Sequence, residues 1–225
     1  MPGRRPPDPP AAVVFDCDGL LLDTESAWTR GEEVLYRQHG VEFTLEHKQE
    51  LLGTGAERAR KIFERHLGLP GAGDRLGEEL IERVAAEVAR EAPPMPGAVE
   101  LVTALRAEGI PIGLASNSPR VMVELALRTA GLDGAFDALV TAEEVERPKP
   151  EPHVYLAAAE ALDAPPGDTI ALEDSHTGVG AALAAGLFVI GVPSLAGVPL
   201  AEAHLVAPSL ESAEVWRATG LHLAA

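Results

Sequence analysis

Short apolar runs that alternate with helical patterns constrain the fold of this chain more than any other feature. The first run begins at Val13 and ends at Phe15, before two acidic residues. Four further runs contain few polar residues and predict buried strands: 110–116, 137–142, 169–174 and 188–192. Strands that are apolar on both faces are typical of a parallel sheet covered by helices on both sides. The alternation therefore predicts right-handed βαβ units and a doubly wound, mainly parallel, Rossmann-like α/β fold.

Residues 24–95 interrupt this alternation, because they contain helical patterns and no strand-like run. The segment follows the first strand and returns to the sheet through the proline-rich residues 92–97. Ligands in open α/β sheets bind at the carboxyl ends of the strands, so a helical insertion here predicts a cap over such a site. We expect a core made of residues 11–23 and 96–225, an all-helical cap at 24–95 and a disordered tail at 1–10.

Charge and composition exclude several classes of partner. The chain has 225 residues and a formal net charge of −17 at pH 7. This charge repels phosphates, so we expect neither nucleic acid nor an anionic membrane as a partner. No segment approaches the roughly 18 consecutive apolar residues of a membrane span. Cys17 is the single cysteine, which excludes an internal disulfide and favours a reducing compartment. We expect a cytoplasmic monomer, with the Cys17 side chain in the core.

Two acidic pairs follow buried strands. Asp16 and Asp18 come directly after the first strand, and Glu173 and Asp174 end the strand at 169–174. Two carboxylates at the end of a buried strand are costly, because each loses hydration and repels the other. Alone, either pair could be a polar turn. Together they favour a bound Mg²⁺ ion, since Mg²⁺ prefers a few carboxylate oxygens with water and phosphate.

Residues suited to an anion follow the other strands. Ser116 and Asn117 lie between the strand at 110–116 and a helix, where hydroxyl and free backbone N–H groups can bind phosphate. Lys149 lies between two prolines after the third strand, in a loop stiff enough to direct its ammonium group. Taken alone, the first segment is better explained as a helix cap, and a solvated loop cation explains the second equally well.

The segments DCDGLLLDTE, LASNS, RPKPEP and LEDSHTGVGAALAAG follow successive strands in this order. As a set they resemble the motifs of the haloacid dehalogenase superfamily of phosphatases and phosphomutases. The resemblance covers residues 16–192, and the helical insertion falls where the branch with β-phosphoglucomutase and sugar-phosphate phosphatases has its cap. Pro148 and His153 depart from the family pattern, and both positions concern loop or helix-start geometry.

The resemblance implies the chemistry of both acidic pairs. Asp16 would be the nucleophile that forms an aspartyl-phosphate. Asp18 would protonate the leaving alkoxide and then deprotonate the attacking water. Mg²⁺ would be bound by Asp16, the backbone carbonyl of Asp18 and Asp174, while Glu173 would hold a metal-bound water.

The resemblance also implies the phosphate-binding groups and the substrate class. The Ser116 hydroxyl and the Asn117 backbone N–H would bind the phosphoryl oxygens, and Lys149 would offset the carboxylates. The expected activity is Mg²⁺-dependent hydrolysis of a small phosphomonoester, with a sugar or polyol phosphate as the substrate.

A phosphomutase is the main alternative. β-Phosphoglucomutases have a histidine shortly after the first motif and an arginine in the first cap loop. Those positions here are Trp28 and Ala56, and Arg58 comes two residues late, which favours hydrolysis. A haloacid dehalogenase would need neither a metal nor an acid at Asp18, and a phospho-receiver carries its aspartate after the third strand. The particular metabolite and the roles of Arg58 and His176 are open from the sequence.

Overall fold

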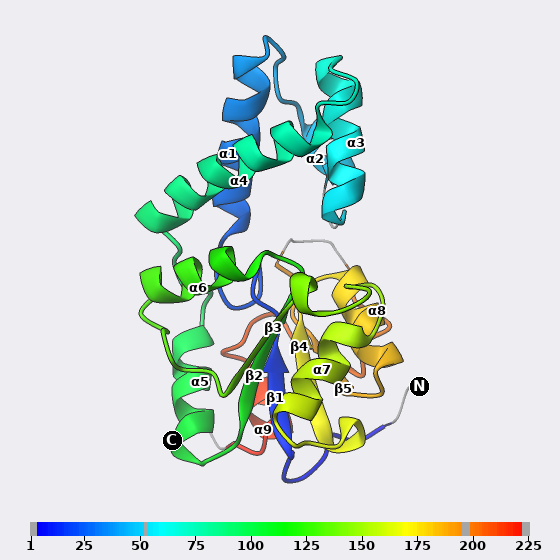
Figure 1. Cartoon of the computed structure of the whole chain (residues 1–225). Coiled ribbons are helices and arrows are strands. Elements are labelled where there is room, and N and C mark those ends of the chain that lie inside the picture. The colour runs from blue at the N-terminus through cyan, green and yellow to red at the C-terminus, as the bar shows by residue number, and fades with distance from the viewer. Residues whose placement is uncertain (1–3, 52–53, 195–198, 222–225) are drawn as a thin grey trace.

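The centre of the molecule is a parallel sheet. The structure, a computed structural model, describes residues 4–51, 54–194 and 199–221. In these residues six strands lie in the order β3-β2-β1-β4-β5-β6, and every neighbouring pair is parallel (Figure 1). The strands are β1 (Ala12–Phe15), β2 (Ile112–Ser116), β3 (Ala138–Thr141), β4 (Thr169–Glu173), β5 (Phe188–Gly191) and β6 (Leu205–Val206).

Both faces of the sheet are covered by helices. Successive side chains of each strand point to opposite faces, so β1 contributes to a buried cluster on each face. The helices of the core are α5 (Ala98–Ala107), α6 (Arg120–Thr129), α7 (His153–Ala161), α8 (His176–Ala184) and α9 (Ala213–Ala218), with short 3₁₀ turns η1 (Ala142–Glu144) and η2 (Pro166–Asp168). Val13 and Phe15 belong to one buried cluster, which also contains residues of α5, α6 and α9. Val14 belongs to a second buried cluster, with residues of α7 and α8. The predicted doubly wound α/β fold is confirmed.

The insertion between β1 and α5 is helical. Its helices, drawn above the sheet in Figure 1, are α1 (Glu25–Gln38), α2 (Leu45–Leu51), α3 (Ala56–Leu67) and α4 (Gly73–Arg90). Leu76, Leu80, Val84 and Val88 recur every four residues along α4 and are buried, which places one apolar stripe against the other cap helices. Gly31 of α1 lets α4 approach closely, since a Cβ there would lie 2.7 Å from Val84 Cγ2. The inserted helical cap is confirmed.

Cap and core are joined by two segments that run side by side. The Asp23 N–H donates to Pro93 O at 2.9 Å, and the Met95 N–H donates to Leu21 O at 2.9 Å. Leu22 and Pro94 form an antiparallel bridge between these two bonds. We call residues 21–23 and 93–95 the linker ribbon. The ribbon returns the chain to the core beside the point at which it left.

Some local features differ from the sequence pattern. The sequence pattern predicts neither β6 nor α9. The strand β6 has two residues and the helix α9 has six, and such short elements give only a weak periodic signal. Composition predicts disorder over residues 1–10. In the described part of that segment, Arg4 donates to Gly186 O at 3.0 Å and to Gly167 O at 2.7 Å. Within the described ranges, no helix has the length and apolar character needed to cross a membrane.

Candidate active site

The carboxyl ends of β1, β2 and β4 bring the predicted site residues together. β1 lies between β2 and β4, so the chain progresses to one side through β2 and β3 and to the other side through β4 and β5. Asp16 follows β1, Ser116 ends β2 and Glu173 ends β4. This is the topological switch point of the sheet, where open α/β folds bind their ligands.

A buried lysine joins two of the acidic residues. The Lys149 ammonium group lies 2.5 Å from Asp16 Oδ1 and 2.6 Å from Glu173 Oε1. Burial lowers the pKa of Lys149, but the carboxylates of Asp16 and Glu173 outweigh that effect and raise the pKa above its ordinary value. Lys149 is therefore a permanent cation, and it comes from the loop after β3, as the sequence predicts.

The carboxylates outnumber this cation. Burial raises the pKa of Asp16 well above its ordinary range; Lys149 opposes the shift, while Glu173 and Asp174 add to it. Burial, and next the charge of Glu173, raises the pKa of Asp174 to about 7. The site thus favours additional positive charge, either as protons or as a cation.

Three carboxylates could share a metal ion. One oxygen each from Asp16, Glu173 and Asp174 lies within 4.8 Å of the others. Ser194 donates to Asp174 Oδ2 at 2.7 Å and Lys149 to Asp16 Oδ1, so within the described residues each aspartate keeps a second oxygen without a hydrogen bond. Hard carboxylate oxygens and a surplus of negative charge fit a divalent cation such as Mg²⁺.

Glu173 differs from the two aspartates, because the protein already occupies both of its oxygens. It is completely buried, and its Oε1 accepts from Lys149 and from the Tyr155 hydroxyl, each at 2.6 Å. Its Oε2 accepts from the Ser175 hydroxyl at 3.1 Å. The structure brings Glu173 into the acidic cluster as predicted, but as the partner of Lys149.

Tyr155 is a site residue that the sequence analysis missed. It lies on α7, is fully buried, and the Lys149 ammonium group is 4.9 Å from the centre of its ring. Its ring and its hydroxyl therefore contact both members of the Lys149–Glu173 pair. Only its position in the sequence points to it: Tyr155 comes six residues after Lys149, on the helix that follows the lysine loop.

Asp18 is held by three hydroxyl groups. Thr24 donates to its Oδ1 at 2.6 Å, while Ser116 and Ser118 donate to its Oδ2 at 3.1 and 2.8 Å. Thr24 is the residue after the linker ribbon and is buried. Asp18 is thus in direct contact with Ser116, which was predicted to bind phosphate, and with the start of the cap. Thr24 and Ser118 were not predicted as site residues, although both lie inside the quoted motifs.

The side chain of Asn117 fixes the lysine loop. Its Nδ2 donates to Lys149 O at 3.0 Å, and its Oδ1 accepts from the Lys149 N–H at 3.0 Å. This reciprocal pair joins the end of β2 to the loop after β3. The sequence predicts a role only for the backbone N–H of Asn117, whereas the structure shows that the side-chain amide positions the lysine loop.

Two glycines allow backbone to approach the carboxylates. Gly178 on α8 lies so close to Glu173 that an added Cβ would overlap its carboxyl group. Gly19 has φ +85°, and an added Cβ would collide with Asp174 Oδ2. A side chain at either position would displace an acidic residue.

Other side chains singled out from the sequence are not part of the hydrogen-bonded network of this cluster in the described residues. Cys17 is buried in the core, as expected. His176 is the exposed first residue of α8 and pairs with Glu202. Trp28 is half-buried among the apolar residues of the cap and core, and Ala56 is exposed at the start of α3. None of these four side chains contacts the acidic cluster through a hydrogen bond or ion pair in the described part of the chain.

Comparison with known proteins identifies the family. The model of the haloacid dehalogenase-like hydrolases matches residues 10–186. The chain belongs to this family. Hexitol phosphatase B of Escherichia coli K12 is 36% identical over 187 residues, covering 81% of this chain and 83% of the relative. Validoxylamine A 7′-phosphate phosphatase of Streptomyces hygroscopicus is 35% identical over 192 residues, covering 80% and 84%.

Solved structures agree with this assignment. CbbY from Rhodobacter sphaeroides in complex with phosphate superimposes with a TM-score of 0.81 at 28% identity, covering 89% of this chain and 95% of that one. The family match and the phosphatase relatives together make the chain a haloacid dehalogenase-like phosphatase.

The close approach at Gly178 generates a prediction about stability. Gly178→Ala should lower the free energy of unfolding by about 1–3 kcal/mol, because the new methyl group must displace the fully bonded Glu173 carboxylate. Gly180→Ala on the same helix is the matched control, since no atom lies within 4 Å of its added Cβ. That control should be neutral or stabilising by up to about 1 kcal/mol, because alanine favours a helix. Denaturant unfolding measures both, and equal effects would contradict the proposed contact.

Proposed function

We propose that the chain is a Mg²⁺-dependent hydrolase of small phosphomonoesters, and that its substrates are sugar or polyol phosphates. The observation that carries this proposal is the Asp16 carboxylate, held 2.5 Å from the Lys149 ammonium group at the switch point of the sheet. The names of the two phosphatase relatives, one acting on hexitol phosphates and one on validoxylamine A 7′-phosphate, support the substrate class.

Asp16 carries the first step. One of its carboxylate oxygens attacks phosphorus, the bond between phosphorus and the ester oxygen breaks, and an aspartyl-phosphate forms. Lys149 restrains this carboxylate and, being cationic, also attracts the phosphoryl group that Asp16 must approach. Both side chains are buried, which limits the access of bulk water to the pair.

Asp18 moves the protons. Its carboxyl group donates a proton to the departing alkoxide, and its carboxylate then accepts one from the water that attacks the aspartyl-phosphate. Release of inorganic phosphate restores Asp16. The hydroxyls of Thr24, Ser116 and Ser118 hold the Asp18 side chain beside the phosphate-binding residues, where such transfers take place.

Ser116, Asn117 and Lys149 bind the phosphoryl oxygens. The Ser116 hydroxyl donates to Asp18 in this structure, so an incoming phosphoryl oxygen would compete with Asp18 for that proton donor. The Asn117 side chain bonds the backbone of Lys149. The group that Asn117 can offer to the phosphoryl oxygens is therefore its backbone N–H.

Asp16, Asp174 and the backbone carbonyl of Asp18 would hold Mg²⁺. When bound, the ion neutralises charge on the phosphoryl oxygens and on the surrounding carboxylates. Glu173 would contribute mainly charge, because both of its oxygens accept hydrogen bonds from the protein.

The role of Asp16 is tested by Asp16→Asn. An amide does not attack phosphorus, so turnover should fall more than about a hundredfold while circular dichroism shows an intact fold. Asp23→Asn is the matched control, because in the described part of the chain the Asp23 side chain bonds only Ser26, and an asparagine Oδ1 can still accept from the Ser26 N–H and hydroxyl. An Asp16→Asn enzyme that retains more than about a hundredth of the wild-type rate would remove Asp16 from the nucleophile role.

The raised pKa of Asp174 makes Mg²⁺ binding depend on pH. Below about pH 7 this carboxyl group holds a proton, and above it the ionised form is available to a cation. Half-saturating Mg²⁺ should therefore fall as the pH rises from 6 to 8, by up to about tenfold for each unit below the pKa.

The measurement is a Mg²⁺ titration of phosphatase activity at each pH. Asp174→Ala should require much more Mg²⁺, and excess metal should restore part of its activity. A Mg²⁺ requirement that does not change between pH 6 and 8 would contradict this role of Asp174. Full activity after treatment with EDTA would show that the metal assignment is wrong.

Hydrolysis and phosphoryl transfer to a second sugar are distinguished by their products. With Trp28 and Ala56 at the two positions where β-phosphoglucomutases have a histidine and an arginine, we expect water to reach the aspartyl-phosphate. The enzyme is incubated with Mg²⁺, β-glucose 1-phosphate and a trace of the 1,6-bisphosphate. Free phosphate should exceed glucose 6-phosphate. Rapid glucose 6-phosphate formation with little free phosphate would establish the mutase instead.

A further inference from the structure

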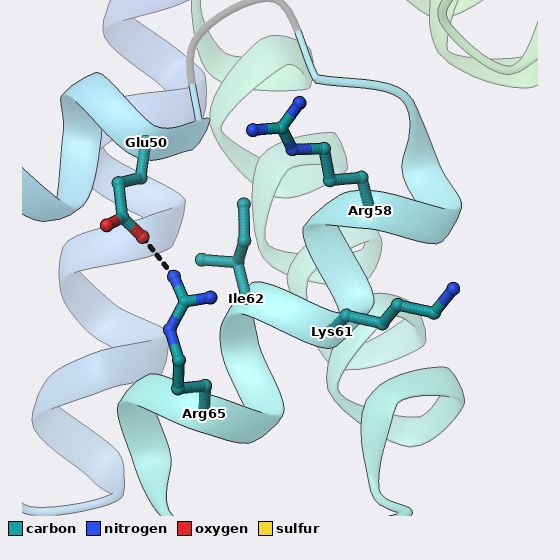
Figure 2. Close-up of a pocket in the computed structure, with 5 residues that line it drawn as sticks. All are labelled: Glu50, Arg58, Lys61, Ile62 and Arg65. Carbon is teal, nitrogen blue, oxygen red and sulfur yellow. Dashed lines mark hydrogen bonds and ion pairs between the residues drawn. The ribbon is translucent and has the colours of Figure 1, made fainter.

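A hollow of about 260 Å³ lies on the cap. Among the described residues it is lined by Glu50 from α2 and by Arg58, Lys61, Ile62 and Arg65 from α3, all of which belong to the cap (Figure 2). None of these five residues belongs to the acidic cluster of Asp16, Glu173 and Asp174, so the hollow is a further candidate binding site.

The lining is cationic in a chain that is strongly anionic. Three of the five lining residues are basic and one is acidic, whereas the whole chain has 35 acidic and 18 basic residues. Figure 2 shows Arg58 and Arg65 on either side of Ile62, while Lys61 extends away from them. Lys61 also pairs with Glu57 at 2.6 Å. The two arginines are therefore the groups that an anion would meet.

Arg65 is held in place by a chain of contacts. Its Nη2 donates to Glu50, which lies 2.9 Å from His66 Nε2. The other nitrogen of His66 lies 2.8 Å from the hydroxyl of Tyr36, whose side chain is buried in the cap core. These contacts restrain one wall of the hollow before any ligand binds, which lowers the entropic cost of binding.

The arginines keep donors available. Within the described residues, Arg58 makes no hydrogen bond or ion pair, and Arg65 uses only Nη2. A guanidinium group presents five N–H donors in a planar fork that matches phosphate, sulfate and carboxylate oxygens. Ile62 lies between the two arginines but belongs to the buried core of the cap, so the arginines are the groups exposed to a ligand.

We propose that this hollow binds a small oxyanion, with Arg58 and Arg65 as its recognition groups. The anion could be a second charged group of the substrate, and that assignment rests on the proposed phosphatase function. It could equally be a free anion that binds the cap independently of catalysis. The chemistry of recognition is the same in both cases.

Binding is measured by calorimetric titration with inorganic sulfate at low ionic strength, where exposed charges are least screened. Arg58→Ala should weaken sulfate binding about five- to tenfold, the loss of one charged hydrogen-bonding group. Arg58→Lys should recover part of it. Arg37→Ala is the matched control, because Arg37 is another exposed cap arginine outside the hollow, on α1. Equal sulfate affinity in the wild type and Arg58→Ala, or no measurable binding to the wild type, would overturn the proposal.

Kinetics then identify the source of the anion. If the substrate supplies it, Arg58→Ala should lower kcat/KM for a sugar bisphosphate about five- to tenfold and leave that for the corresponding monophosphate unchanged. If a free anion binds instead, sulfate should change the rate at which the wild type turns over the monophosphate. Sulfate should change the rate of Arg58→Ala less. An enzyme inactive on every phosphoester would refute the proposed function, while the sulfate titration would still decide the anion site.

Discussion

The ion pair between Lys149 and the buried carboxylates determines how the rest of the site is built. Removing a charged lysine from water is unfavourable, and it is tolerated here because Asp16 and Glu173 both lie within hydrogen-bond distance. One cation does not balance three acidic residues. Burial, reinforced by repulsion from the neighbouring carboxylates, raises the pKa values of Asp16 and Asp174. The core therefore folds with a deficit of positive charge, which a proton or a metal ion can relieve.

The arrangement of the sheet could be predicted because it depends on short, local patterns. The apolar runs before Asp16, Ser116 and Glu173 mark buried parallel strands, and residues at the carboxyl ends of such strands meet at one edge. The order of the motifs along the chain then places Lys149 in the same cluster. Each of these inferences needs only the residue types and their spacing.

The remaining features depend on how separate elements approach one another. Tyr155 looks like an ordinary buried aromatic residue of α7 until its hydroxyl is seen to meet Glu173. Gly178 looks like a weak point in a helix until the Glu173 carboxylate is found where its side chain would be. Ser194 reaches Asp174 from a loop after β5 that has no distinctive pattern. A sequence does not contain these distances, so no local signal distinguishes such residues from their neighbours.

The linker ribbon places Thr24 at the boundary between cap and core, and Thr24 holds Asp18. A rotation of the cap about this ribbon would move the Thr24 hydroxyl relative to β1, and so would change the restraint on the Asp18 side chain. Under the proposed mechanism, the position of the Asp18 carboxyl group, which transfers the protons, therefore depends on the angle between cap and core. A ligand that holds the cap at one angle would alter proton delivery without touching any reacting atom.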